Sequence, residues 1–195
     1  MKEGSDLLTP EQGQALLQLA RQALETRIRQ GKPISTTRLT EAVDARLSEK
    51  GATFVTLTTG GMLRGCIGTP EARVPLVEDV QENAVRAATM DPRFPPVSVE
   101  ELHKLRIEVS ILTPPRLLDC PPERRAQCVR PGIDGLLLVS GYARGLLLPQ
   151  VWEKIPEPEE FLRSLCYKAG LSSSAWRQPG TELYTFQVQA FEEAE

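Results

Sequence analysis

The chain has 195 residues, a net charge of -3, 41% hydrophobic residues and 25% charged residues. This length supports one large domain or two packed halves whose core needs no metal or disulfide. The acidic balance disfavours nucleic acid as a partner, because nucleic-acid-binding proteins usually carry a basic surface. The sequence shows no apolar run of membrane-spanning length and opens on polar residues, so we predict a cytoplasmic protein without membrane attachment.

The N-terminal part predicts two helices. Thr9 as N-cap, Pro10 at the first helical position and Gln12 closing a capping box indicate a helix that begins at Pro10 and ends at Gly31. Apolar residues at helical spacing predict a second amphipathic helix further along: Leu39, Val43 and Leu47. Both helices are expected to pack on the rest of the protein.

The next segments predict a hairpin and a helix. Residues 54–58 are rich in β-branched and aromatic residues, residues 59–61 form a glycine-containing turn, and residues 62–68 return as the partner strand. A helix then begins at Pro75 and ends before Pro92, because the residue preceding a proline avoids the helical region.

The second half of the chain predicts mostly strands. We expect a short helix at 100–105, a strand at 106–113, an irregular excursion at 120–131, and a hairpin of two apolar runs at 135–139 and 145–149, buried on both faces. A helix at 158–169 and a last strand at 183–191 follow. Hairpins without regular βαβ alternation favour an α+β fold, mainly an antiparallel sheet with flanking helices. The expected internal seam lies near 114–131.

The four cysteines show no metal-binding pattern. Cys66, Cys120, Cys128 and Cys166 form no C-x-x-C pair, and His103 is the single histidine, so we predict four free thiols and no metal site. Cys166 shares an apolar helix stripe and is expected in the core. Cys120 and Cys128 lie in the irregular excursion, where surface or packing roles are expected.

The hexapeptide LRGCIG at residues 63–68 is the segment most suited to chemistry. Strand alternation would place Arg64 beside Cys66 on one face and turn Leu63 toward the core on the other. A neighbouring guanidinium stabilises a thiolate, which is the reactive form of cysteine. Gly65 and Gly68 leave the backbone bare, as happens where a ligand or another chain segment approaches closely. Tight packing around a buried cysteine would explain the same residues.

A thiol enzyme also needs an acid or base. His103 lies in a short polar helix and is expected to be an ordinary surface residue. Glu108 lies on the polar face of its strand and is the better candidate if that strand neighbours residues 62–68. Asp91 and Arg93 could equally form a pair that stabilises a turn.

Several blocks together resemble the AMMECR1 family. They are LRGCIG at 63–68, DPRFPPV at 91–97, IEVSILTPP at 107–115, RGLLLPQVW at 144–152 and FLRSLCYKAG at 161–170. The resemblance runs from about residue 10 to the C-terminus and suggests a single domain of this family over 1–195. Thr69 and Pro70 depart from the usual continuation of the hexapeptide.

The resemblance implies a two-part α+β fold, with a larger antiparallel-sheet part and a smaller part enclosing a cleft. It also implies association with Memo-like and radical SAM proteins. No activity is established for the family, so no catalytic residue and no cofactor is carried over from it.

Two functional hypotheses remain open. In the first, the protein is an enzyme component in which Cys66 is nucleophile or ligand, Arg64 stabilises negative charge, and Glu108 or Asp91 transfers protons. In the second, it is a non-enzymatic scaffold that binds a protein or an RNA. Gly65 and Gly68 would then allow the backbone to approach the ligand, and Arg64, Arg93 and Arg144 would contact an anionic or carbonyl-rich group on it. Asp91 is a further candidate for ligand binding.

Overall fold

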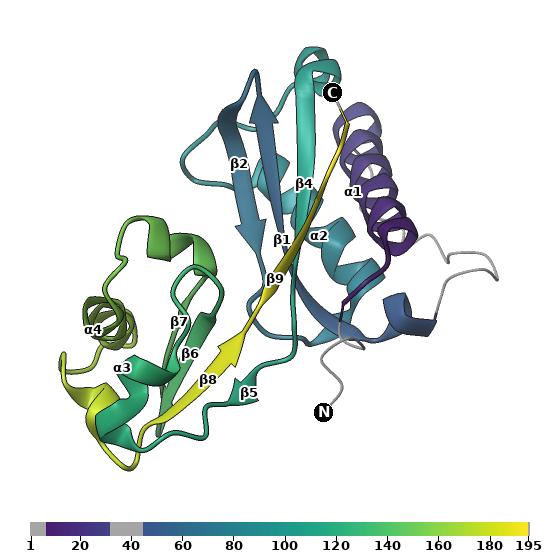
Figure 1. Cartoon of the computed structure of the whole chain (residues 1–195). Helices are drawn as coiled ribbons and strands as arrows, with labels where there is room; N and C mark the ends of the chain where they lie inside the picture. Colours follow the sequence, from purple (N-terminus) through teal and green to yellow (C-terminus); the bar gives the residue numbers. More distant parts are fainter. Residues whose placement is uncertain (1–6, 32–44, 195) are drawn as a thin grey trace. The chain divides into compact units, whose positions relative to one another are not determined.

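The computed structural model describes residues 7–31 and 45–194, and its chain divides into two compact units. The first unit contains Met1–Leu112 and Gln189–Glu195, and the second contains Thr113–Val188 (Figure 1). The chain crosses from the first unit to the second after Leu112, beside the seam expected near 114–131, and returns at Gln189. No feature of the sequence indicated the second crossing.

The first unit is built on a five-stranded sheet. Its main path has the order β2-β1-β4-β9, and the short β3 pairs with β1. The pairs formed by β1 with β2, β3 and β4 are all antiparallel. The strand bounds are β1 Lys50–Thr59, β2 Met62–Gly68, β3 Val74–Pro75, β4 Leu105–Leu112 and β9 Val188–Glu192. On this path β2 forms one edge, with only β1 beside it.

Two long helices, α1 (Pro10–Gln30) and α2 (Leu76–Thr89), pack against one face of this sheet (Figure 1). Alternate residues of β1 and β4 are buried beneath them, among them Val55 and Val109, each 0% exposed. The predicted start of α1 is confirmed, since Thr9 and Gln12 form the capping box and Gly31 ends the helix in a left-handed conformation. We call the other face of β2-β1-β4 the polar face; it carries Phe54, Thr56, Thr58, Cys66, Arg106, Glu108 and Ser110.

A buried polar network fixes α2 against β1. The Oδ2 atom of Asp79 accepts hydrogen bonds from the amide and hydroxyl of Thr53 at 2.8 and 2.7 Å, and from Asn83 at 3.0 Å. Burial raises the pKa of Asp79 despite these donors. Because buried polar groups are costly when unpaired, this network specifies how the helix sits on the strand.

The second unit contains a four-stranded sheet of order β5-β8-β6-β7. Its strands and α-helices are β5 Arg116–Leu117, β6 Gly135–Ser140, β7 Ala143–Leu147, β8 Glu182–Phe186, α3 Arg125–Cys128 and α4 Pro158–Lys168. The predicted hairpin is present as β6 and β7, but burial on both faces is wrong. Leu136 and Leu138 are 0% exposed, whereas Leu137 between them is half-exposed, so only one face packs on α4 and the core.

Two further expectations are corrected. The single strand predicted at 183–191 is two strands, β8 and β9, which belong to different sheets. The two strands separate at Gln187. Its amide donates to the hydroxyl of Thr113 and its carbonyl accepts from the amide of Thr113, so the hydrogen-bond pattern of β8 does not continue into β9. Cys120 and Cys128 are not free thiols but form a disulfide, because the turns between them bring their Cα atoms within 6.6 Å.

The α+β class with antiparallel sheets and flanking helices is confirmed. The helix predicted around Leu39 and Val43 falls outside the described residues, apart from a short 3-10 helix, η1, at Ala45–Ser48. Within residues 7–31 and 45–194, no helix has both the length and the apolarity to cross a bilayer.

Candidate functional site

A β-bulge interrupts β2 inside the hexapeptide. Leu57 of β1 pairs with Gly65, but the next residue, Thr58, pairs with Leu63, so Arg64 has no partner across the ladder. A bulge inserts one extra residue and changes the direction of side chains on its own strand. Leu63 therefore lies opposite Thr58 on the polar face and is 43% exposed, which corrects the expectation that it points into the core.

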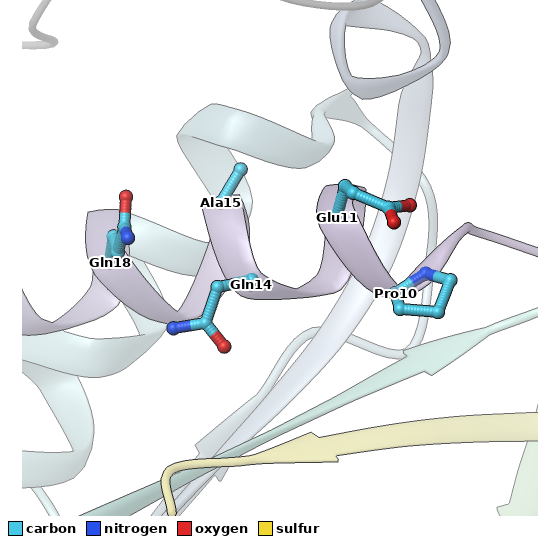
Figure 2. A pocket seen from close by; sticks show the side chains of 5 residues that line it. All are labelled: Pro10, Glu11, Gln14, Ala15 and Gln18. Carbon is cyan, nitrogen blue, oxygen red and sulfur yellow. The ribbon is translucent and has the colours of Figure 1, made fainter.

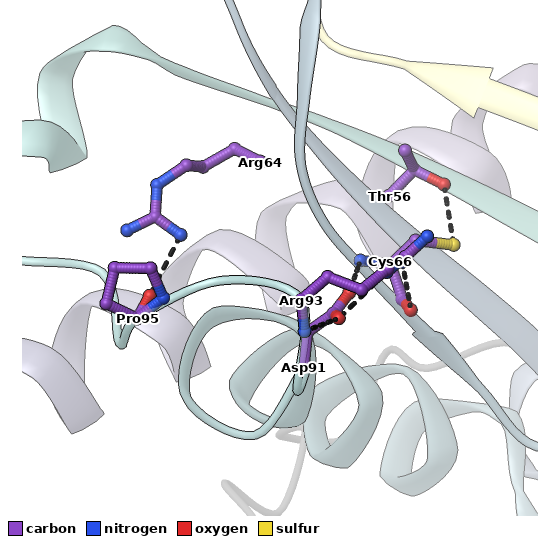
Figure 3. A network of polar contacts seen from close by, with 6 residues as sticks. All are labelled: Thr56, Arg64, Cys66, Asp91, Arg93 and Pro95. Atoms are coloured by element: carbon purple, nitrogen blue, oxygen red, sulfur yellow. Dashed lines mark hydrogen bonds and ion pairs between the residues drawn. The ribbon is translucent and has the colours of Figure 1, made fainter.

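The bulge also separates Arg64 from Cys66. The guanidinium of Arg64 donates two hydrogen bonds to the carboxylate of Glu101, at 2.7 and 3.1 Å, and one to the carbonyl of Pro95 at 3.0 Å. Figure 3 shows it directed toward Pro95, while the sulfur of Cys66 points toward Thr56. The expected side-by-side orientation is wrong, because regular alternation does not continue through a bulge.

Asp91 and Arg93 instead bind the backbone of Cys66. The amide of Cys66 donates to Oδ2 of Asp91 at 2.8 Å, and Nη2 of Arg93 donates to the carbonyl of Cys66 at 3.4 Å (Figure 3). The two side chains thus complete the hydrogen bonding of an edge strand at this residue, where bare backbone would otherwise invite another strand. They hold Cys66 at one position in space.

The same two residues form a tight ion pair. Nε and Nη2 of Arg93 donate to the two carboxylate oxygens of Asp91 at 2.9 and 2.7 Å, and the amide of Arg93 donates at 3.0 Å. These bonds hold the pKa of Asp91 well below its usual range. Asp91 is 4% exposed and stays a carboxylate, so its role is to orient Arg93.

Arg93 is the arginine whose guanidinium contacts Cys66. The hydrogen bonds to Asp91 raise the pKa of Arg93 above its ordinary value. Half of its side chain is solvent-accessible. The guanidinium can therefore meet an anion arriving from solvent while it is bonded to the carbonyl of Cys66.

Cys66 also belongs to a polar row across the sheet. Thr56 pairs with Cys66 on one side and with Glu108 on the other, so the three lie side by side on the polar face. The hydroxyl of Thr56 lies 3.4 Å from the sulfur and donates to it. Glu108 is two strands from Cys66, about 10 Å between backbones, and its carboxylate accepts from the hydroxyl of Ser110 at 3.1 Å.

Contacts within the protein account for both glycines of the hexapeptide. A Cβ atom on Gly65 would lie 2.2 Å from the backbone oxygen of Ala87, because α2 crosses β2 there. A Cβ on Gly68 would lie 2.2 Å from the ring of Phe54. The close approach expected at these glycines is made by other segments of this chain, and the prediction that they contact a ligand stays a prediction.

The remaining candidates lie elsewhere. Arg144 belongs to β7 of the second unit, not to the unit that contains Cys66. His103 is exposed on the 3-10 helix η2 (Val99–Lys104), as expected of a surface residue. Cys166 is 0% exposed on α4, which confirms its place in the core, and burial raises the pKa of its thiol.

The rest of the described chain offers little further chemistry. A shallow surface pocket runs along two turns of α1 and is lined by Pro10, Glu11, Gln14, Ala15 and Gln18 (Figure 2). It contains no nucleophile and one carboxylate. In the described part of the chain, no group of three or more His, Cys, Asp or Glu side chains could hold a metal ion.

Sequence reasoning missed Thr56 and Glu101. Thr56 looked like one of several strand threonines, and only the register between β1 and β2 places it at the sulfur. Glu101 was expected only as part of the short helix at 100–105; in the structure it caps η2, since it accepts from the amide of Ser98. Its bidentate bond with Arg64 lowers its pKa to about 2, and that partnership joins segments 37 residues apart.

The match to a known protein family covers all the sequence blocks described above. The AMMECR1 family model matches residues 17–191. The chain belongs to the AMMECR1 family. A protein of Thermococcus gammatolerans is 44% identical over 193 residues, covering 94% of this chain and 91% of the relative. One from Methanothermobacter thermautotrophicus is 43% identical, covering 95% and 96%.

A solved structure supports the fold. The crystal structure of an uncharacterized protein from Pyrococcus horikoshii matches with a TM-score of 0.81 at 43% identity, covering 95% of this chain and 93% of that one. That protein is described as uncharacterized, so the comparison supports the fold of this chain but assigns no activity to it.

Proposed function

We propose that this AMMECR1 protein is a thiol-dependent enzyme component whose reactive group is Cys66 on the polar face of the first unit. One observation carries the proposal: the partly exposed Cys66 has its backbone amide bound by Asp91 and its carbonyl bound by the guanidinium of Arg93. A cysteine that only filled space would need neither arrangement.

The roles follow from the contacts. Cys66 attacks an electrophilic centre of the substrate, while Arg93 and the Thr56 hydroxyl stabilise negative charge on the sulfur. Arg93 takes the role first assigned to Arg64, whose guanidinium is engaged by Glu101 and Pro95. Glu108 lies in the same row and is the nearest strand carboxylate for proton transfer.

The proposal retains the partners implied by the family resemblance, namely Memo-like and radical SAM proteins. A partner that supplies the substrate or takes up the product would need access to the polar face. We therefore expect the substrate to reach Cys66 within a complex with such a partner. The reactivity of the thiol can be tested in the absence of the partner.

Alkylation of the native full chain tests the proposal. Near neutral pH, a small alkylating agent in limited amount is expected to add once, at Cys66, because Cys166 is buried and Cys120 is joined to Cys128. Replacing Arg93 by Gln is expected to slow this addition by about three- to tenfold, since a cation near a thiol favours its charged form. Peptide mapping identifies the modified residue.

Arg64→Gln is the matched control. It removes an arginine two residues from Cys66 whose guanidinium bonds elsewhere, so the labelling rate should change by less than about twofold. Continued protection of Cys166 reports that each variant is folded. Equal slowing by both arginine variants, or no slowing by either, would refute the role of Arg93. A native Cys66 that reacts no faster than Cys166 would remove the thiol chemistry and favour the scaffold hypothesis.

A further inference from the structure

The disulfide of the second unit encloses a short, weakly organised segment. Cys120 and Cys128 are eight residues apart, and between them lie a three-residue 3-10 helix, η3 (Pro122–Arg124), and the four-residue α3. Helices this short are not stable by themselves, because nucleation costs more than one or two hydrogen bonds return. The position of the segment therefore depends on what ties it to the unit.

Hydrogen bonds from Arg125 join the segment to the rest of the unit. The side chain of Arg125, 7% exposed, donates to three backbone carbonyls: those of Trp176, of Gln178 at 3.4 Å and of Thr181 at 2.7 Å. These acceptors lie in the segment that runs from the 3-10 helix η5 (Ala175–Arg177) to β8. Burial lowers the pKa of Arg125. A buried cation whose hydrogen bonds go to carbonyl oxygens is tolerated while those bonds stay in place.

The disulfide itself faces solvent. Cys128 is exposed and Cys120 is partly exposed, so we expect a thiol reagent to reach the bond without unfolding the unit. Accessible disulfides are the ones that exchange readily with cellular dithiols, whereas structural disulfides resist reduction. The disulfide is therefore the constraint on this segment that is most easily removed. Arg125 lies between the two cysteines in the sequence.

We propose that Cys120 and Cys128 form a redox-sensitive latch that controls how firmly Arg125 holds the segment 175–181. In the oxidised state the disulfide restrains the 120–128 segment and keeps the guanidinium seated on its three carbonyls. A dithiol reductant opens the latch by thiol–disulfide exchange. Its two sulfurs become joined in a disulfide, and its two protons and two electrons pass to the sulfurs of Cys120 and Cys128.

In the reduced state the 120–128 segment opens more often, and the bonds from Arg125 to the segment 175–181 break with it. Trp176, at 1% exposure, becomes transiently accessible. Leu136 and Leu138 of β6 and Phe161 of α4 belong to the same core cluster as Trp176, but they lie in elements that Arg125 does not bond, and they are expected to stay packed. The latch therefore loosens one region while the unit stays folded.

Hydrogen–deuterium exchange of the full chain tests this proposal. The oxidised protein is prepared with oxidised glutathione and the reduced protein with dithiothreitol, and intact mass confirms each state. On reduction, amide protection in residues 120–128 and 175–181 is expected to fall by roughly ten- to seventyfold, the upper limit given by the loop-closure entropy of so short a ring. Protection in β6 and in β4 of the first unit should not change.

Two variants separate the effect of the disulfide from the effect of the Arg125 hydrogen bonds. The double variant Cys120→Ser/Cys128→Ser should show the reduced pattern in both buffers, which excludes effects of the reagents on other residues. Arg125→Gln should loosen residues 175–181 while its disulfide still forms, so reduction adds little further loss there.

Three results would refute the proposal that Cys120 and Cys128 form a redox-sensitive latch. In the first, the two cysteines stay reduced in oxidised glutathione. In the second, reduction leaves residues 175–181 fully protected. In the third, protection is lost to the same extent throughout β6 and β8, which would make the disulfide a structural crosslink of the whole unit.

Discussion

Gly65→Ala is the sharpest test of why the hexapeptide carries a glycine before its cysteine. The added Cβ would lie 2.2 Å from the backbone oxygen of Ala87 and 3.1 Å from its carbonyl carbon. Ordinary contact begins near 3.4 Å, so β2 and α2 must separate by roughly 1 Å, an overpacking that costs about 1–3 kcal/mol or more. The atom in the way belongs to the main chain of a helix and cannot rotate aside.

The unfolded chain partly offsets this cost. Alanine has less conformational freedom than glycine when unfolded, which stabilises the folded state by about 0.4–1 kcal/mol. The net loss expected for Gly65→Ala is therefore about 1–2 kcal/mol. Urea unfolding followed by far-ultraviolet circular dichroism measures it. Both tryptophans of the chain, Trp152 and Trp176, lie in the second unit, so their fluorescence serves as an internal control.

Gly68→Ala is the matched variant on the same strand. Its Cβ would also clash at 2.2 Å, but with the ring of Phe54, a side chain that can turn toward solvent on the polar face. Its expected loss is about 1 kcal/mol or less. If Gly65→Ala costs no more than Gly68→Ala, or less than about 0.5 kcal/mol, the close crossing of α2 over β2 is not what requires glycine at residue 65.

Two further predictions concern stability. Asp91→Asn should destabilise the protein by about 1–3 kcal/mol near neutral pH, because it replaces the charged acceptor of the Cys66 and Arg93 donors. Since the pKa of Asp91 is lowered by folding, its stabilisation is complete above about pH 4 and is lost as the pH falls further. The difference between wild type and variant in urea titrations should therefore shrink in acid, and a difference that stays constant down to about pH 2 would contradict this. Phe161→Ala should lower the free energy of unfolding of the second unit by about 3–5 kcal/mol. The ring of Phe161 is fully buried and stacks on Trp152, with 3.8 Å between the two ring centroids. Tryptophan fluorescence on urea unfolding measures that loss, and a loss under about 1 kcal/mol would show that the stack is not part of the core.

Local signals were sufficient for most elements. The capping box at Thr9, the glycine turn after β1 and the proline after α2 are decided by neighbouring residues, and each element appears where its signal predicted. The α+β class followed from the same signals, because hairpins and isolated helices leave few other ways to bury their apolar faces. Some failures came where a distant segment competed with the local pattern.

Gln187 shows such a competition. Residues 183–191 read as one strand, but the backbone of Gln187 bonds to Thr113, so the chain leaves one sheet and enters another. That outcome is not encoded in a window of a few residues. The prediction for Cys120 and Cys128 failed for a different reason: they form no C-x-x-C pair, and the short helical turns between them, which bring them together, were predicted only as an irregular excursion.

The candidate site divides in the same way. The sequence by itself determined that Cys66 lies on a glycine-flanked strand near charged residues, since residue types and periodicity depend only on the local chain. Tertiary structure alone decided which arginine meets it. A one-residue bulge turned Arg64 toward Glu101, and the loop after α2 brought Arg93 to the strand edge, because pairing register and loop path depend on contacts between segments about 30 residues apart.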